Sequence, residues 1–335
     1  MNDIKNKIIE LFNGIEKKNI SYTDLKSVLD CILEGNVDKN EVYSFLDLLH
    51  LSDASKIISK KGEIHFWAMK IAQIIEKYNF HSGQLFLQRV KRYKEKTLFI
   101  ITEGVNKKTI SYNKFWNDLT LIFKSIKSLS KNSDTNLGIL SFNQYESALV
   151  DLCCLAFGFR VAPIPLNSTS NHLSYIIDQA NLTHLFLGGE KAIRLFNSIS
   201  NKHKIEIIDV NNIGSVKGDN ISWDNFLDLG ETNNTSGPDL SITNQDMNWT
   251  STIMYTSGST SDPKGVTFNQ KNIVSKRFAR ALALPDINSN DIFLSYLPLF
   301  HTFGRYFELM GSIFWGSTYA FGESPSFSSL LKDFK

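Results

Sequence analysis

The sequence Tyr255-Thr-Ser-Gly-Ser-Thr-Ser-Asp-Pro-Lys-Gly-Val266 is the most informative stretch of this 335-residue chain. An apolar run, Ile253-Met-Tyr255, leads into a loop rich in hydroxyls and glycine, as when a strand ends in a phosphate-handling loop. Glycine lets the backbone approach an anion, amides and hydroxyls donate hydrogen bonds, and lysine adds a mobile positive charge. The candidate phosphate-binding residues are Thr256, Ser257, Gly258, Ser259, Thr260, Lys264 and Gly265.

The loop differs from a Walker A sequence, in which a lysine follows the second glycine and opens a helix. Here the two glycines, Gly258 and Gly265, are too far apart, and Lys264 precedes the second one. The alternative interpretation is a Ser/Gly-rich surface loop with no function. The order of hydroxyls, glycine and lysine behind an apolar strand favours the phosphate site.

Four segments together resemble the AMP-forming acyl-adenylate superfamily, which includes acyl-CoA synthetases, firefly-type luciferases and peptide-synthetase adenylation domains. The loop is similar to the signature loop of that family, and Ser295-Tyr-Leu-Pro-Leu-Phe-His-Thr-Phe-Gly304 resembles the element beside its acyl pocket. Two weaker matches, Ile110–Phe115 and Gly158–Leu166, lie upstream in the family's order. The resemblance extends from about residue 80 to residue 335, and the first two segments are its specific part.

The resemblance implies a two-step reaction. A carboxylate joins the α-phosphate of ATP and expels pyrophosphate, and a thiol, usually that of coenzyme A, then attacks the acyl-adenylate. ATP, Mg²⁺ and coenzyme A are therefore the expected cofactors and co-substrates. Lys264 and His301 are the candidate catalytic residues, the latter as an orienting donor, and Phe300, His301 and Phe303 are expected to line the acyl pocket. For the two phenylalanines, plain core packing is the alternative.

The periodicity of apolar residues predicts two kinds of architecture. Residues 1–80 show helical stripes, with Ser21 and Asp24 as a capping box, and form an expected small helical extension. From about residue 96, strands alternate with helices, which predicts an α/β fold with helix-covered, mostly parallel sheets over residues 81–335. The polar segment near 211–247 is expected to connect a first αβ unit to a second one that starts at Thr250.

Bulk properties limit the partners. The net charge of +2 argues against an obligate nucleic-acid partner, since such domains concentrate basic residues on one face. We find no signal sequence and no apolar run of about 18 residues that could span a membrane. The expected location is the cytoplasm, with peripheral membrane contact left open, and the expected ligands are a carboxylic acid and ATP.

Relatives continue with elements for magnesium, adenine and ribose and with a catalytic lysine, none of which occurs before Lys335. The sequence therefore predicts a truncated chain that is inactive alone and pairs with a missing C-terminal half or a complementary chain. The leading functional prediction is activation of a medium- or long-chain fatty acid. Arg305 and Glu308, three residues apart, are expected to pair on a helix surface and favour that subclass. The alternatives are an amino-acid or aryl-acid adenylation domain and a degenerate, non-catalytic nucleotide-binding protein.

Overall fold

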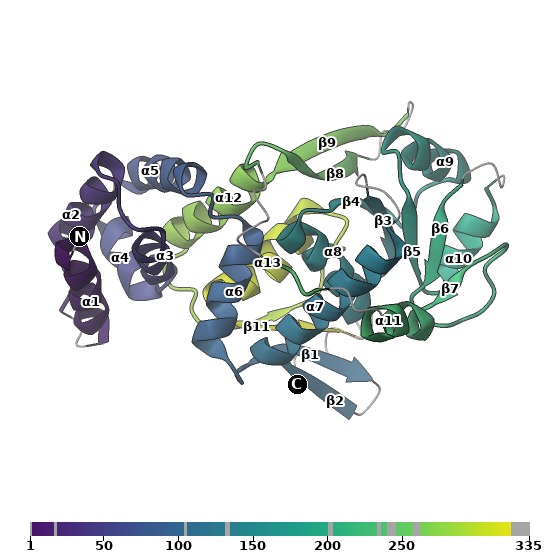
Figure 1. Ribbon diagram of the computed structural model, residues 1–335, viewed down its shortest axis with the longest axis horizontal. Coiled ribbons are helices and arrows are strands. Elements are labelled where there is room, and N and C mark those ends of the chain that lie inside the picture. The colour runs from purple at the N-terminus through teal and green to yellow at the C-terminus, as the bar shows by residue number, and fades with distance from the viewer. Residues whose placement is uncertain are drawn as a thin grey trace.

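The computed structural model describes residues 2–16, 19–103, 106–130, 135–199, 204–232, 236–239, 246–256 and 262–322. Six helices precede the first strand, and the first five form one end of the elongated molecule (Figure 1). They are α1 (Asn2–Glu16), α2 (Tyr22–Glu34), α3 (Lys39–Leu48), α4 (Ser52–Lys60), α5 (Ile64–Lys77) and α6 (Ser82–Tyr93). The predicted capping box is present, because the Ser21 hydroxyl accepts from the Asp24 amide and the Asp24 carboxylate accepts from the Ser21 amide.

A seven-stranded sheet has the order β7-β6-β5-β3-β4-β8-β9. All its pairs are parallel except the antiparallel pair β8–β9, so the predicted mostly parallel sheet is confirmed. Its strands are β3 (Asn136–Ser141), β4 (Arg160–Ile164), β5 (His184–Gly188), β6 (Glu206–Asp209), β7 (Ile221–Ser222), β8 (Thr250–Thr256) and β9 (Lys264–Asn269).

Helices cover both faces of this sheet, and neighbouring residues of a strand point to opposite faces. Phe186 of β5 belongs to the large core on one face, whereas Leu185 and Leu187 belong to a separate core on the other. The large core is covered by α7 (Tyr112–Leu129), α8 (Tyr145–Phe157) and α11 (Trp223–Thr232), and the second core by α9 (Ser170–Gln179) and α10 (Glu190–Asn197). Burial on both faces explains the nearly continuous apolar sequence of these strands.

A second sheet has the order β10-β11-β1-β2, with β1 (Thr97–Glu103), β2 (Asn106–Ser111), β10 (Ile292–Leu294) and β11 (Thr318–Phe321). Between its strands the chain forms α12 (Gln270–Ala283), the π-helix η1 (Phe303–Leu309) and α13 (Met310–Trp315). The prediction that Thr250 starts a second αβ unit is wrong, because β8 pairs with β4 and completes the first sheet. The second sheet instead joins strands that are about 200 residues apart in sequence, a pairing that local periodicity does not encode.

The elements β7, α11 and α4 were not predicted from the sequence. The polar segment near 211–247 contains β7 and α11, whose Trp223 and Phe226 are buried. Helix α4 is also present, with Ala54 and Ile58 buried. Both helices are short, with 9 and 10 residues, so each shows few repeats of the helical period.

The helical extension contacts the αβ region at several buried points. Helix α5 packs on α12, and Phe80 contacts the ring of Phe278 at a centroid distance of 6.3 Å. Asp47 of α3 pairs with Arg89 and Arg92 of α6. One continuous core includes side chains of both regions. The division into residues 1–80 and 81–335 stays a prediction.

Candidate functional site

The candidate phosphate loop lies at the end of the β8–β9 hairpin. Thr256 is the last residue of β8 and pairs with Lys264, the first residue of β9, and both are exposed. The predicted residues Ser257, Gly258, Ser259 and Thr260 lie outside the described residues. Gly265 approaches its neighbour closely, since a Cβ atom there would come within 2.8 Å of Ile253 Cγ2. The hairpin thus presents the two described polar residues of the loop, Thr256 and Lys264, to solvent.

His301 is exposed and stands directly before the π-helix. Its backbone amide donates to Pro298 O at 2.9 Å, and its carbonyl accepts from the Arg305 amide at 3.0 Å. Its ring Nδ1 lies 3.3 Å from the Phe303 amide, which donates to it. A π-helix is rare and frequently marks a functional site. These bonds hold His301 in the turn and leave Nε2 without a hydrogen bond in the described structure.

Asn143, which sequence reasoning missed, fixes the turn that carries His301. It follows β3, and its side-chain amide donates to Ser295 Oγ at 3.0 Å and to Leu297 O at 2.8 Å. Its Oδ1 accepts from the Leu299 amide at 2.9 Å. Gly304 lies against the same turn, and a Cβ atom at its position would come within 2.5 Å of Leu297 O. No local pattern reveals Asn143, because its partners lie about 150 residues further along the chain.

Arg305 anchors the π-helix to the large sheet. Its Nε and Nη2 donate to the two carboxylate oxygens of Asp151 at 2.7 and 2.5 Å, and its Nη1 donates to Thr252 Oγ1 at 2.8 Å. Burial alone would lower the pKa of Arg305, but the charge of Asp151 and the neighbouring Tyr306 raise it. The predicted surface pair of Arg305 with Glu308 is therefore wrong. Glu308 is buried, which raises the pKa of its carboxyl, while the backbone amides of Leu297 and Tyr296 lower it by less.

The two predicted pocket phenylalanines differ in exposure. Phe300 is half-buried, whereas Phe303 is 45% exposed and contacts the tilted ring of Phe307 at a centroid distance of 4.6 Å. Phe303 is therefore not a core residue. An exposed aromatic ring beside His301 is available to contact an apolar ligand.

The hairpin and the π-helix belong to one neighbourhood. Thr252 of β8 accepts from Arg305, and Phe268 of β9 contacts the ring of Tyr306 at 5.3 Å. Thr252 and Thr256 are four residues apart on the strand, which corresponds to about 13 Å. Thr256 and Lys264 lie on the hairpin, and His301 precedes the π-helix. These predicted residues therefore belong to or adjoin two elements that pack directly on each other.

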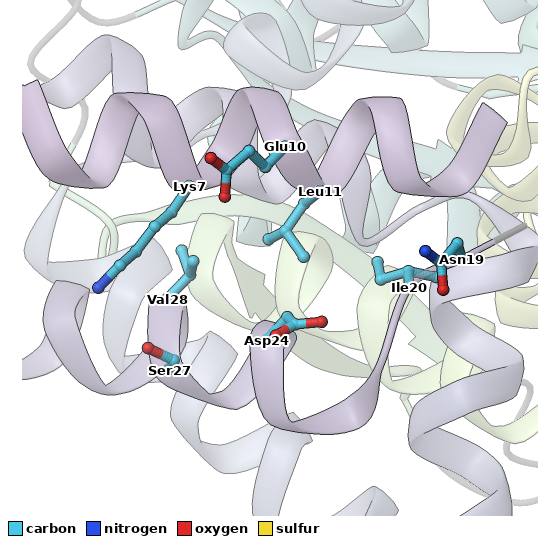
Figure 2. A pocket seen from close by; sticks show the side chains of 8 residues that line it. All are labelled: Lys7, Glu10, Leu11, Asn19, Ile20, Asp24, Ser27 and Val28. Atoms are coloured by element: carbon cyan, nitrogen blue, oxygen red, sulfur yellow. The ribbon is translucent and has the colours of Figure 1, made fainter. Parts of the chain in front are cut away.

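Cavities among the described residues also occur in the helical extension. One of about 290 Å³ lies between α1 and α2, where Leu11 and Val28 point toward each other (Figure 2). None of the predicted site residues lines it. Within the described ranges no cluster of His, Cys, Asp and Glu could hold a metal ion, and no helix has the length and apolarity to cross a bilayer.

Known proteins resemble this chain in sequence and in fold. The chain is similar to long chain acyl-CoA synthetase 5 of Arabidopsis thaliana, with 29% identity over 213 residues, which cover 59% of this chain and 31% of the relative. It is also similar to the long-chain-fatty-acid–CoA ligase ACSBG2 of Xenopus laevis, with 25% identity over 255 residues, 74% of this chain and 34% of the relative. The chain thus spans about a third of the length of these relatives.

Solved structures share the fold. The O-succinylbenzoate coenzyme A synthetase of Bacillus subtilis in complex with AMP has a TM-score of 0.57 and 22% identity, over 75% of this chain and 58% of that one. The N-terminal domain of FACL13 from Mycobacterium tuberculosis has a TM-score of 0.58 and 18% identity, over 76% and 60%. The family model of AMP-binding enzymes matches residues 86–335, which is most of the chain. The chain belongs to the family of AMP-binding enzymes.

Proposed function

We propose that this chain supplies the pyrophosphate-side loop and one wall of the acyl pocket for ATP-dependent activation of a carboxylic acid. The acid forms an acyl-adenylate with release of pyrophosphate, and coenzyme A then accepts the acyl group with release of AMP. The observation that carries the proposal is the β8–β9 hairpin, whose ends Thr256 and Lys264 are exposed and whose Thr252 and Phe268 contact Arg305 and Tyr306 of the π-helix that follows His301.

The chemistry of the first step explains the roles of these residues. Charge develops on the leaving pyrophosphate, so fixed donors and a cation around it lower the barrier. In the proposal, the loop residues 256–260 and Gly265 surround the phosphates, and Lys264 neutralises the developing charge. Mg²⁺ would share that neutralisation; one solved neighbour, the B. subtilis O-succinylbenzoate coenzyme A synthetase, is in complex with ATP and magnesium.

For the acid we propose the medium- to long-chain fatty acid class. The support is the set of relatives named long-chain acyl-CoA synthetases and the exposed aromatic ring of Phe303 beside His301. In the proposal His301 orients the reacting carboxylate, while Phe300 and Phe303 contact its apolar chain. Coenzyme A as the acceptor rests on the same relatives.

The test is the substitution Lys264→Ala in this protein. Loss of one cation at the leaving phosphates should cost about 2–4 kcal/mol of transition-state stabilisation, which lowers carboxylate-dependent ATP–pyrophosphate exchange by roughly 30-fold or more. Lys107→Ala, which removes an equally exposed lysine from β2, is the control. Unchanged exchange at unchanged stability would contradict the role of Lys264.

A further inference from the structure

A hollow of about 650 Å³ lies between α3 and α6, where the helical extension meets the rest of the chain (Figure 1). Its lining includes four cationic side chains, which are Lys39, Lys91, Arg92 and Lys94. The three lysines are exposed. The only carboxylate among the described residues that line it is Asp47, which already pairs with the buried Arg89 and with Arg92. The α3–α6 hollow therefore presents positive charge that its own carboxylate does not balance.

A second hollow, of about 320 Å³, lies between α1 and α3. It adjoins the first one, because Asn40 and Ser44 line both. Its other lining residues are Ile8, Ile9, Phe12, Lys5, Asp38 and Glu41. Ile9 is 47% exposed, and the centroid of the Phe12 ring lies 5.3 Å from the guanidinium of Arg92, which lines the α3–α6 hollow. Apolar surface in the α1–α3 hollow therefore lies directly beside the cluster of positive charge.

Glu41 in the α1–α3 hollow places a different requirement on a ligand. Its Oε2 is buried and has no hydrogen-bond partner among the described residues. A buried acceptor is normally satisfied by a donor from the protein, from water or from a ligand. A ligand that fits both hollows therefore needs negative charges, an apolar group and a hydrogen-bond donor.

These requirements distinguish between classes of ligand. An ionised phosphate or a fatty-acid carboxylate offers acceptors but no donor to Glu41, and the flat surface of a bilayer does not enter two concave hollows. A polypeptide that contains Asp or Glu carries carboxylates, apolar side chains and backbone N–H groups together. The two hollows therefore suit an acidic segment of a protein.

We infer that the α3–α6 and α1–α3 hollows form a docking site for an acidic segment of a partner protein. Carboxylates of the segment pair with the lysines of the α3–α6 hollow, an apolar side chain packs on Ile9 and Phe12, and a backbone N–H donates to Glu41. The inference goes beyond the proposed function, because none of the residues assigned to acid activation lines either hollow. It gives the helical extension a binding role.

The experiment selects binders to the purified chain from a phage library that displays random 12-residue peptides. Peptides enriched by the selection should carry several Asp or Glu residues and at least one large apolar residue. Fluorescence anisotropy then measures their affinity for the chain and for the double substitution Lys39→Glu with Lys91→Glu. The double substitution should weaken binding at least about tenfold, since two attractive charges become repulsive. Added salt should weaken binding to the unmodified chain as well.

The matched control for charge is Lys107→Glu with Lys108→Glu, which makes the same change at two exposed lysines of β2. This variant should bind the enriched peptides as the unmodified chain does. Ile9→Asn should weaken binding, whereas Ile213→Asn, at a 37% exposed position, should not. All the substituted side chains are partly or fully exposed, so the melting temperatures of the variants should stay close to that of the unmodified chain.

Three results would overturn the docking site. They are an absence of enriched acidic peptides, equal binding by the Lys39→Glu, Lys91→Glu variant, and an equal loss in the β2 control. Vesicles of phosphatidylserine and phosphatidylcholine form a further arm and should not bind. Vesicle binding that the double substitution abolishes, without acidic peptide binding, would assign the surface to a membrane instead. Neither ATP nor a carboxylic acid substrate is present, so the outcome is independent of the proposed adenylation.

Discussion

Arg305 and Arg277 are two buried arginines that contact the same aromatic ring, Tyr306, and they differ in what balances their charge. Arg305 makes a bidentate pair with Asp151 and donates to Thr252 and to the Tyr306 hydroxyl. Arg277 makes no side-chain hydrogen bond within the described structure. The first arginine is therefore a fixed part of the fold, which ties the π-helix to β8 and α8. The second retains donor capacity that the fold does not use.

The difference separates two kinds of buried charge. Removing one partner of a buried ion pair leaves the other charge unpaired and destabilises the fold. Removing a buried charge that has no partner should stabilise the fold, because the cost of burying that charge disappears. Substitutions around Tyr306 should therefore change stability in opposite directions. The four predictions below test this separation, starting with the largest expected effect.

Asp151→Ala should be the most destabilising change. It leaves the fully buried Arg305 guanidinium without its carboxylate, and the free energy of unfolding should fall by about 3–5 kcal/mol. Urea unfolding followed by far-UV circular dichroism measures the change. The double substitution Asp151→Leu with Arg305→Met should recover much of that loss, because it removes both charges. A loss below about 1 kcal/mol for Asp151→Ala would show that the pair of Asp151 and Arg305 does not anchor the π-helix.

Asp47→Ala also removes one partner of a buried ion pair, here at the contact between the helical extension and the rest of the chain. Asp47 Oδ1 accepts from Arg89 Nη1 at 2.6 Å, and Arg89 is fully buried. Asp47 is slightly more exposed than Asp151, so we expect a somewhat smaller loss, of about 3 kcal/mol.

Limited proteolysis of the Asp47→Ala variant adds a structural readout. Faster cleavage near residues 80–95, with a stable remaining core, would support the predicted division at residue 80. Loss of the whole fold would instead show that residues 1–80 are integral to it.

The sequence predicted most strands of the large sheet and most helices because each of them carries its own apolar pattern. The β3, β4 and β5 segments are continuous apolar runs, α7 has a clear helical stripe, and α8 is a 13-residue segment that is apolar and buried on nearly all sides. The two family motifs located the hairpin and the turn before the π-helix. These features depend on neighbours close in sequence, which is the information that a single sequence contains.

The contacts that position the candidate site are long-range and were not predictable in this way. Asn143 acts on a turn about 150 residues away, and Asp151 pairs with Arg305 across a similar separation. The spacing of Arg305 and Glu308 suggested a surface pair, but that spacing assumes an exposed helical face. The π-helix packs both residues inward, and the partner of Arg305 lies on α8. No sequence pattern singled out Arg277.

Glu308→Gln should have a smaller effect that depends on pH. Burial raises the pKa of Glu308, although the amides of Leu297 and Tyr296 partly oppose this. A carboxyl with a raised pKa in the folded state contributes its full stability below the unfolded pKa, near 4.5, and loses it as the pH rises through the folded pKa. Unfolding free energies from pH 4 to pH 7 should therefore decline relative to those of Glu308→Gln. Parallel curves for the two proteins would mean that Glu308 is ionised equally in both states.

The smallest effect is expected at Glu76, where α5 meets α12. Its carboxylate accepts from Lys271 and Asn248, and these bonds, led by the one from Lys271, lower the pKa of Glu76. The sign is opposite to that at Glu308, so this stability is present above the unfolded pKa and is lost as the pH falls through the folded pKa. The side chains of Lys271 and Glu76 are 35% and 41% exposed, and solvent screens them. Glu76→Gln should therefore cost about 0.2–1 kcal/mol near pH 7 and nothing near pH 3.

The control is Glu190→Gln, which breaks a more exposed pair with Arg194 inside one helix and should cost still less. A loss at Glu76 as large as that at Asp47 would show that this exposed contact holds the extension to the αβ region as strongly as the buried pair does.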